Sequence, residues 1–230
     1  MQLSACLRRF RDNRSGVTLL EFAFGLPLFL TAGMWGVELT NMAVTHQRLS
    51  QLALELADNA SRVGLYSGQA TVQLREIDLN DVLQATRTHG SSINLTANGR
   101  IILSSLENIN GTQRIHWQRC IGAKSGAGYD SSYGTTSTTA GTTTNASDAG
   151  TPAATGMGEA GAKVNAPLNS AVMFVEVNYL YTPMIGNGWF ASPRKLKYVA
   201  SFIVRDNRDL TQLYNPSPAA TRSTCNLYGA

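Results

Sequence analysis

The longest run of apolar residues lies near the N-terminus, from Val17 to Val37, and contains one charged residue, Glu21. As a helix with a rise of ~1.5 Å per residue, a run of this length just crosses the ~30 Å hydrocarbon core of a membrane. Pro27 does not exclude a helix, because membrane helices tolerate proline with a local kink. Trp35 falls near the far end of the run, where aromatic rings favour the membrane interface. The pattern predicts a transmembrane helix over residues 17–40.

Helical periodicity continues beyond this run, now with polar residues on the opposite face. The apolar positions recur at helical spacing and are Leu49, Leu52, Ala53, Leu56, Ala60 and Val63. The rest of the circumference carries polar residues, namely Gln47, Arg48, Gln51, Glu55 and Asp58. We therefore expect an amphipathic extension of the helix over residues 41–66. Further on, Asp78 or Asn80 is the expected N-cap of a short second helix that runs to about Thr88.

Strand patterns follow the helices. Asn110-Gly111 between Arg100–Ile109 and Thr112–Cys120 predicts a β-hairpin, because both turn residues adopt positive φ readily. Two later runs, Ala171–Tyr181 and Lys197–Arg205, have the period-two pattern of strands. One face of the first is expected to carry Ala171, Met173, Val175, Val177, Tyr179 and Tyr181, and the alternating positions of the second are Tyr198, Ala200, Phe202 and Val204. The predicted fold class is α+β, with one antiparallel sheet packed on the long N-terminal helix.

Two segments between the strands have unusual compositions. Residues from about 122 to 162 are nearly all Gly, Ser, Thr, Ala and Asn, and we expect a flexible surface insertion that buries little apolar surface. A glycan-bearing or adhesive loop is the alternative. The segment Thr182–Pro193 is apolar instead, with Met184, Ile185, Trp189 and Phe190. It either folds onto the sheet or contacts another subunit.

The positive charge is concentrated at the N-terminus. The chain carries a net charge of +4, and the first sixteen residues contribute +3 of it through Arg8, Arg9, Arg11 and Arg14 against Asp12. The remaining residues are almost neutral, so the sequence gives no basis for a nucleic-acid partner. A basic cluster before an apolar span places the N-terminus in the cytoplasm. A conventional secretory signal peptide is less favoured, because the run is too long and no Ala-x-Ala-like cleavage site follows it.

The junction between the basic cluster and the span carries a specific motif. The residues RDNRSG-VTLLEF, followed by AFGLPL, resemble the processing site of type IV prepilins and, more closely, the TadE/TadF-like pseudopilins of the tight-adherence (Tad/Flp) pilus. The positions that match that family are Gly16, Glu21, Phe22, Ala23, Leu26, Pro27 and Leu28. Thr18 and Leu19 are more similar to ordinary type IV pilins. The resemblance covers only residues 8 to 45.

This resemblance implies a function and its partners. A prepilin peptidase would cut between Gly16 and Val17 and remove residues 1–16 as a leader. Glu21, one helical turn into the new chain, would meet the ammonium of Val17 or that of a neighbouring subunit, and Phe22 completes the motif. The implied protein is a minor pilin-like subunit that spans the inner membrane once and exposes residues 67–230 to the periplasm. Its partners would be other pilins or pseudopilins and the inner-membrane assembly platform.

The cysteines divide in the same way as the charge. Cys120 and Cys225 lie in the expected exported part, where a disulfide is favoured, whereas Cys6 lies in the leader. Three unrelated buried thiols remain the alternative. A pairing of Cys120 with Cys225 would fasten the C-terminal tail to the hairpin.

The sequence offers no enzyme chemistry. His46, His89 and His116 lack the spacing of metal ligands, and we expect no metal, cofactor or small-molecule substrate. Gly156-x-Gly158-x-x-Gly161 has no strand before it, so it is not a dinucleotide-binding fingerprint. Two other functions stay open. One is a signal-anchored periplasmic binding or adhesion domain that never polymerises, and the other is a pseudopilin of a type II secretion or type IV pilus system.

Overall fold

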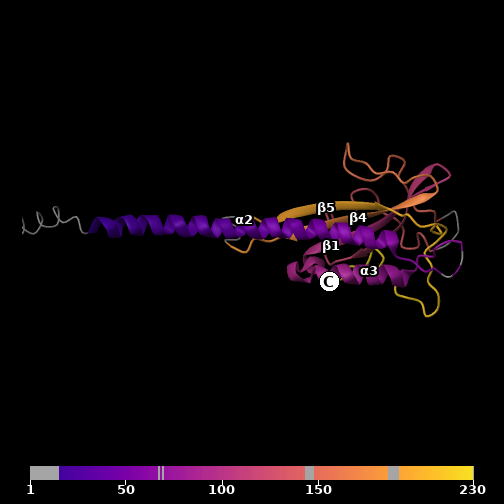
Figure 1. Cartoon of the computed structure of the whole chain (residues 1–230), viewed down its shortest axis with the longest axis horizontal. Helices are drawn as coiled ribbons and strands as arrows, with labels where there is room; N and C mark the ends of the chain where they lie inside the picture. The colour runs from indigo at the N-terminus through magenta and orange to yellow at the C-terminus, as the bar shows by residue number, and fades with distance from the viewer. Residues whose placement is uncertain (1–15, 67, 69, 143–147, 186–191, 230) are drawn as a thin grey trace, which may run out of the picture. The chain divides into compact units, whose positions relative to one another are not determined.

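The computed structural model describes residues 16–66, 68, 70–142, 148–185 and 192–229, and the chain forms two compact units. We call them the helix unit, Met1–Ala43 with Pro183–Ser192, and the sheet unit, Val44–Thr182 with Pro193–Ala230. The fold is α+β as predicted, with a long N-terminal helix α2 (Val17–Arg62) and a five-stranded antiparallel sheet (Figure 1). Helix α2 contributes to the helix unit up to Ala43 and to the sheet unit from Val44 onward.

The second half of α2 packs its apolar face on the sheet, as its periodicity predicts. The buried residues of this face are Leu49, Leu52, Ala53, Leu56, Ala57 and Ala60, and Val63 lies just past the helix end, half-buried. On the same segment, His46 Nδ1 lies 2.6 Å from the hydroxyl of Tyr198 in strand β5. The helix therefore covers the face of the sheet to which Tyr198 belongs.

Arg208 caps the C-terminal end of α2. Its guanidinium donates hydrogen bonds to the carbonyl oxygens of Ala60 at 3.1 Å, Ser61 at 3.1 Å and Val63 at 2.8 Å. The last carbonyls of a helix lack partners within the helix, and a cation is favourable at that end of the helix dipole. Asp206 accepts a further hydrogen bond from Arg208 at 3.1 Å and balances its buried charge.

The second helix, α3 (Glu76–His89), begins earlier than predicted. Arg75 is its N-cap, and Asp78 is the third residue inside the helix, so neither Asp78 nor Asn80 is the N-cap. The Asp78 carboxylate instead accepts from the backbone N–H of Arg75 at 3.1 Å and from its guanidinium at 2.6 Å. In a capping box, an acidic side chain at the third helical position accepts a hydrogen bond from the backbone N–H of the N-cap residue in this way. Two short helices that the sequence did not predict follow, η2 (Ser91–Ile93) and α4 (Leu95–Asn98).

The sheet is antiparallel throughout, and its strand order is β3-β2-β1-β4-β5. The strands are β1 (Gly99–Ile109), β2 (Thr112–Ile121), β3 (Thr151–Pro152), β4 (Ser170–Tyr181) and β5 (Arg194–Ile203). The β1–β2 hairpin has the predicted turn, with φ of 51° at Asn110 and 81° at Gly111. Strand β5 begins three residues before and ends two residues before the predicted Lys197–Arg205. Strands β1 and β4 are central and pair along nearly their whole length.

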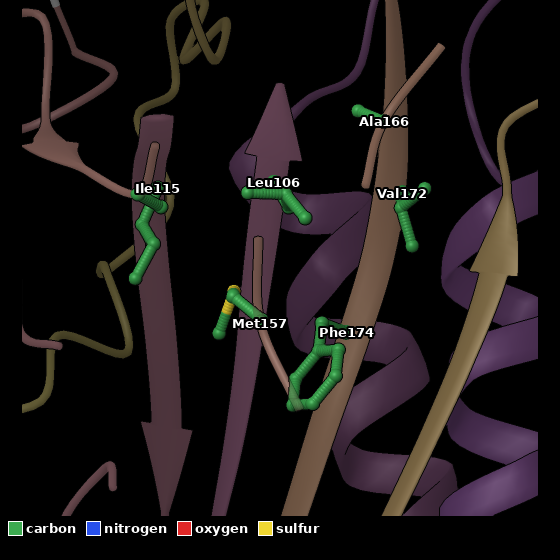
Figure 2. Packing of buried hydrophobic residues seen from close by; sticks show 7 residues of the cluster. Leu106, Ile115, Met157, Ala166, Val172 and Phe174 are labelled. Carbon is green, nitrogen blue, oxygen red and sulfur yellow. The ribbon is translucent and has the colours of Figure 1, made fainter. Parts of the chain in front are cut away.

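The two central strands are buried on both faces, which the alternating pattern of β4 did not predict. All the residues of β4 from Ala171 to Tyr179 are buried. On the helix face lie Met173, Val175 and Val177, whose β5 partners include Tyr198 and Ala200. The other face carries a second apolar cluster, formed by Leu106, Ile115, Val172 and Phe174 with Ala153, Met157 and Ala166 (Figure 2).

Part of the Gly/Ser/Thr-rich segment covers this second face, so the prediction that it buries little is wrong. Met157 and Ala140 are completely buried, and Ala153 is 8 % exposed. The backbone is paired as well, because Met157 and Val164 exchange hydrogen bonds at 3.0 and 2.7 Å. Tyr133 of the segment also packs edge-to-face on Phe174 of β4, with their ring centroids 5.3 Å apart, and Val164 packs against the same cluster. Residues 143–147 lie outside the described part of the chain.

The C-terminal tail is fastened to the sheet by the predicted disulfide between Cys120 in β2 and Cys225. The two cysteines are 105 residues apart, and closing a loop of about this length contributes up to ~4.7 kcal/mol in the chain-entropy model. Buried Arg100 adds hydrogen bonds to the tail carbonyls of Cys225 at 2.6 Å and Leu227 at 2.7 Å. Cys6 lies outside the described residues.

Buried ion pairs join the elements of the sheet unit. Glu76 of α3 pairs with Arg119 of β2, and their side chains are 0 % and 1 % exposed. His116 of β2 lies 2.8 Å from Glu107 of β1, which also accepts from Ser105 at 2.7 Å. Burial lowers the pKa of His116, whereas its hydrogen bond with Glu107 and the charge of that carboxylate raise it. The effect of Glu107 is the larger one in sum, so the pKa of His116 lies above its ordinary value of 6.5.

The burial of Met157 predicts a large effect of truncation. Met157→Ala should lower the free energy of unfolding of the sheet unit by about 2–5 kcal/mol, as expected when a buried side chain leaves a cavity. Exposed Leu168→Ala is the control and should change it by less than about 0.5 kcal/mol. Urea unfolding of the full chain in detergent, followed by near-UV circular dichroism, measures both. Equal effects of the two substitutions would mean that the segment does not contribute to the core.

The His116–Glu107 pair predicts a pH-dependent stability. The pKa of His116 is raised in the folded state, so its pairing with Glu107 adds to the free energy of unfolding. This added stability is fully present below the unfolded pKa of about 6.5 and is lost as the pH rises through the folded-state pKa. The stability difference between the wild type and His116→Gln should therefore be largest in mild acid and shrink toward pH 9. In a Glu107→Gln background this trend should reverse, because burial, which lowers the pKa of His116, then acts without the opposing carboxylate. A difference that is independent of pH in the wild-type background would contradict the pairing.

Candidate processing and membrane-anchoring site

Gly16 and Val17 form the boundary at which helix α2 begins. The α-helix starts at Val17, and Gly16 lies in a 3-10 turn directly before it, so the peptide bond between the two residues joins this turn to the first residue of α2. Gly16 is exposed, and a Cβ added to it would meet no other atom within 4 Å. The fold itself therefore does not require glycine at this position. A requirement for glycine would come from a molecule that binds here.

Glu21 and Phe22 project from the second turn of α2. Both side chains are exposed, and Phe22 is 63 % exposed. Among the described residues, no hydrogen bond or ion pair of Glu21 is found. The basic residues Arg8, Arg9, Arg11 and Arg14 lie outside the described part of the chain. Glu21 follows Val17 by four residues and so shares its side of the helix.

The surface of α2 around this site is apolar over its first five turns. The large exposed side chains are Leu19, Leu20, Phe22, Phe24, Leu26, Leu28, Phe29, Leu30, Met34, Trp35 and Val37. The helix is long and apolar enough to cross a membrane, and its most apolar 18-residue window is 0 % buried. Leaving a side chain of this kind in water instead of burying it costs about 1.5–3 kcal/mol. This surface requires an apolar environment, as a membrane anchor or a signal segment would have.

Two threonine hydroxyls in the first half of α2 donate hydrogen bonds to carbonyl oxygens of the same helix. The hydroxyl of Thr31 donates to the carbonyl oxygen of Leu28 at 2.9 Å, and that of Thr40 to Gly36 at 2.8 Å. Such bonds remove the need for water, so threonine is tolerated in hydrocarbon. Between Val17 and Val37, Glu21 is left as the one ionisable residue in the sequence.

Glu38 is a site residue that the sequence analysis missed. It follows the apolar run directly, is only 5 % exposed, and accepts hydrogen bonds from the backbone N–H groups of Met184 at 3.0 Å and Ile185 at 3.1 Å. These residues belong to the apolar segment Thr182–Pro193, of which Trp189 and Phe190 lie outside the described residues. The available signal was that Glu38 is the first charged residue after the apolar run Val17–Val37.

The histidines do not come together. His46 contacts Tyr198, His89 lies 3.2 Å from Glu55, and His116 pairs with Glu107. In the described part of the chain, no group of three or more His, Cys, Asp or Glu residues is placed to hold a metal ion.

The glycine motif forms turns, and one cavity in the described part of the chain lies beside the disulfide. Gly156–Gly161 forms turns around the Met157–Val164 bridge, and no helix follows it to bind a phosphate. A cavity of about 270 Å³ beside the disulfide is lined by five Ser and Thr residues together with other polar and apolar residues, among them Arg100, Asp130 and Tyr228. The Arg100 guanidinium is used to hold the C-terminal tail.

Comparisons with known proteins return no match: no family model, no curated protein and no solved structure is similar to this chain. The features of this chain that bear on its function are therefore the residues around Gly16, the exposed apolar surface of α2 and the α+β fold.

Proposed function

We propose that this protein is a minor pilin-like subunit, a TadE/TadF-like pseudopilin, that takes part in assembly of a Tad/Flp pilus. The observation that carries the proposal is the register at the start of α2. The helix begins at Val17 directly after Gly16, and Glu21 is the one ionisable residue in the exposed apolar segment that follows. A membrane anchor needs only the apolar segment. The glycine at its boundary and the acid one turn later require a further explanation.

The fold supports the same proposal. A long helix with one apolar half and one amphipathic half, the latter packed on an antiparallel sheet, is the architecture that the resemblance implies. The first half would lie in the inner membrane with its N-terminus in the cytoplasm. The sheet unit would then face the periplasm, where the Cys120–Cys225 disulfide is stable.

The proposed mechanism begins with removal of the leader. A prepilin peptidase would hydrolyse the Gly16–Val17 bond, release the arginines that anchor the helix to the cytoplasmic side, and leave an ammonium on Val17. An ionised Glu in the span costs about 2.5 kcal/mol or more without a partner. The new ammonium, in the same or a neighbouring subunit, would provide that partner. Interaction with another subunit would link processing to assembly with other pilins and the membrane platform.

Processing is predicted to remove residues 1–16. Intact-mass measurement of protein from a host with a matching prepilin peptidase should give an N-terminus at Val17. Gly16→Phe should leave the full-length chain, because the enclosed site of a peptidase that selects glycine cannot admit a bulky side chain. Gly25→Phe is the matched control, since a Cβ at Gly25 also meets nothing within 4 Å, and it should be processed normally.

Two results would count against this processing site. An N-terminus near residue 33 would indicate conventional signal peptidase. A wild-type chain that keeps its arginines, despite an active peptidase, would indicate a permanent signal anchor with a non-polymerising domain.

Glu21 is predicted to act in assembly and to have no role in folding of the sheet unit. Glu21→Gln keeps the size and helix propensity of the residue but removes the charge that would pair with the Val17 ammonium. Pilus output and co-purification with other pilins should fall about tenfold or more, equivalent to ~1.4 kcal/mol or more of lost interaction. Glu55→Gln, in the same helix but exposed on the sheet unit, should leave both unchanged. Normal piliation with Glu21→Gln would show that this carboxylate is only tolerated.

A further inference from the structure

The segment that joins β4 to β5 has an unusual composition for a surface loop. Thr182–Pro193 contains no charged residue, and its Pro183–Ser192 part forms one compact unit with the apolar half of α2. Within the described part of this segment, Pro183 is buried, Ile185 is half-buried and Met184 is 69 % exposed. The segment therefore turns apolar side chains outward beside an apolar helix.

Glu38 places this segment at a defined depth along the helix. Glu38 is the twenty-second residue of α2, about 32 Å along the axis from its start at ~1.5 Å per residue. A hydrocarbon core is ~30 Å thick, so Glu38 and the residues that it binds lie at the level of the membrane surface when Val17 lies at the opposite one. Trp35, one turn before Glu38, is 56 % exposed, as expected of an aromatic residue in the interfacial layer.

The hydrogen bonds of Glu38 provide partners for backbone N–H groups that would otherwise lack them in an apolar layer. A peptide N–H without a partner is unfavourable away from water, and it excludes most loops from lipid. Here the carboxylate of Glu38 accepts the N–H groups of two consecutive residues, Met184 at 3.0 Å and Ile185 at 3.1 Å. The Met184 and Ile185 side chains are thereby held next to the helix, and their N–H groups need no water.

We infer that Pro183–Ile185 is a second membrane contact of this protein, which lies in the interfacial layer of the bilayer and is held there by Glu38. The occupant of this surface is phospholipid, at the boundary between headgroups and acyl chains. The contact is continuous with the exposed apolar surface of α2 and rests on the proposal that α2 spans the membrane. It gives Glu38 a positioning role that differs from the assembly role of Glu21.

Site-specific fluorescence in bilayers tests this contact. Met184→Cys is introduced in a Cys6→Ser background with the Cys120–Cys225 disulfide intact, labelled with an environment-sensitive fluorophore, and reconstituted as the full chain in phosphatidylcholine vesicles. Doxyl groups near the headgroup end of the acyl chains should quench this label strongly, and aqueous iodide should quench it weakly. The label at Thr112→Cys, an exposed residue of the hairpin, should show the opposite pattern. Glu38→Ala should lower lipid quenching at position 184 by about half or more, whereas Glu55→Ala should not change it.

A label at Phe29→Cys in the same vesicles separates the two proposals, because Phe29 lies on the exposed apolar face of α2. Lipid quenching at position 29 without lipid quenching at position 184 overturns the second contact and leaves the membrane anchor intact. Absence of lipid quenching at both positions overturns the anchor as well. If the label at position 184 is shielded from iodide only at high protein-to-lipid ratio and is not quenched by lipid, the surface binds another subunit and the inference fails.

Discussion

The sheet unit depends on one constraint, which is that the central strands β1 and β4 are apolar on both faces and each face must be covered. The second half of α2 covers one face. The segment that contains Ala153, Met157 and Ala166 covers the other. The disulfide at Cys120 and the buried Arg100 then hold the C-terminal tail against the sheet. A composition that alone would indicate disorder thus becomes ordered, because the sheet provides most of the large apolar side chains and the segment adds Met157 and Tyr133 to them.

Burial of so much of the sheet unit requires hydrogen-bonding partners for the buried charges and for the carbonyl groups at a buried helix end. Arg208 serves both needs, since it caps the carbonyls at the end of α2 and pairs with Asp206. Glu76 and Arg119 balance one another between α3 and β2. Replacing one partner of such a pair leaves an uncompensated buried charge, which costs more than the intact pair contributes. These pairs therefore fix which elements lie together more than they add to stability.

The sequence was sufficient wherever one local signal decides the structure. The apolar run, the helical spacing from Leu49 to Ala60 and the Asn110-Gly111 turn each predicted an element that is present. It was insufficient where the deciding partner is remote. Asp78 looked like an N-cap because such residues favour that position, but its carboxylate serves Arg75 from inside the helix. The arginine cap by Arg208 and the loop contact of Glu38 join residues far apart in sequence, and no periodicity reports such a pairing.

The two carboxylates near opposite ends of the apolar segment, Glu21 and Glu38, have different surroundings. Glu21 and Glu38 are seventeen residues apart, about 25 Å along the helix axis. Glu38 is bound by the backbone of the chain's own β4–β5 segment, and its burial is explained by the fold. Glu21 is exposed and, among the described residues, has no such contact. Under the proposed function, the partner of the Glu21 carboxylate would be a cation that arises after synthesis or lies on another molecule. Cleavage after Gly16 would create such a cation one helical turn away.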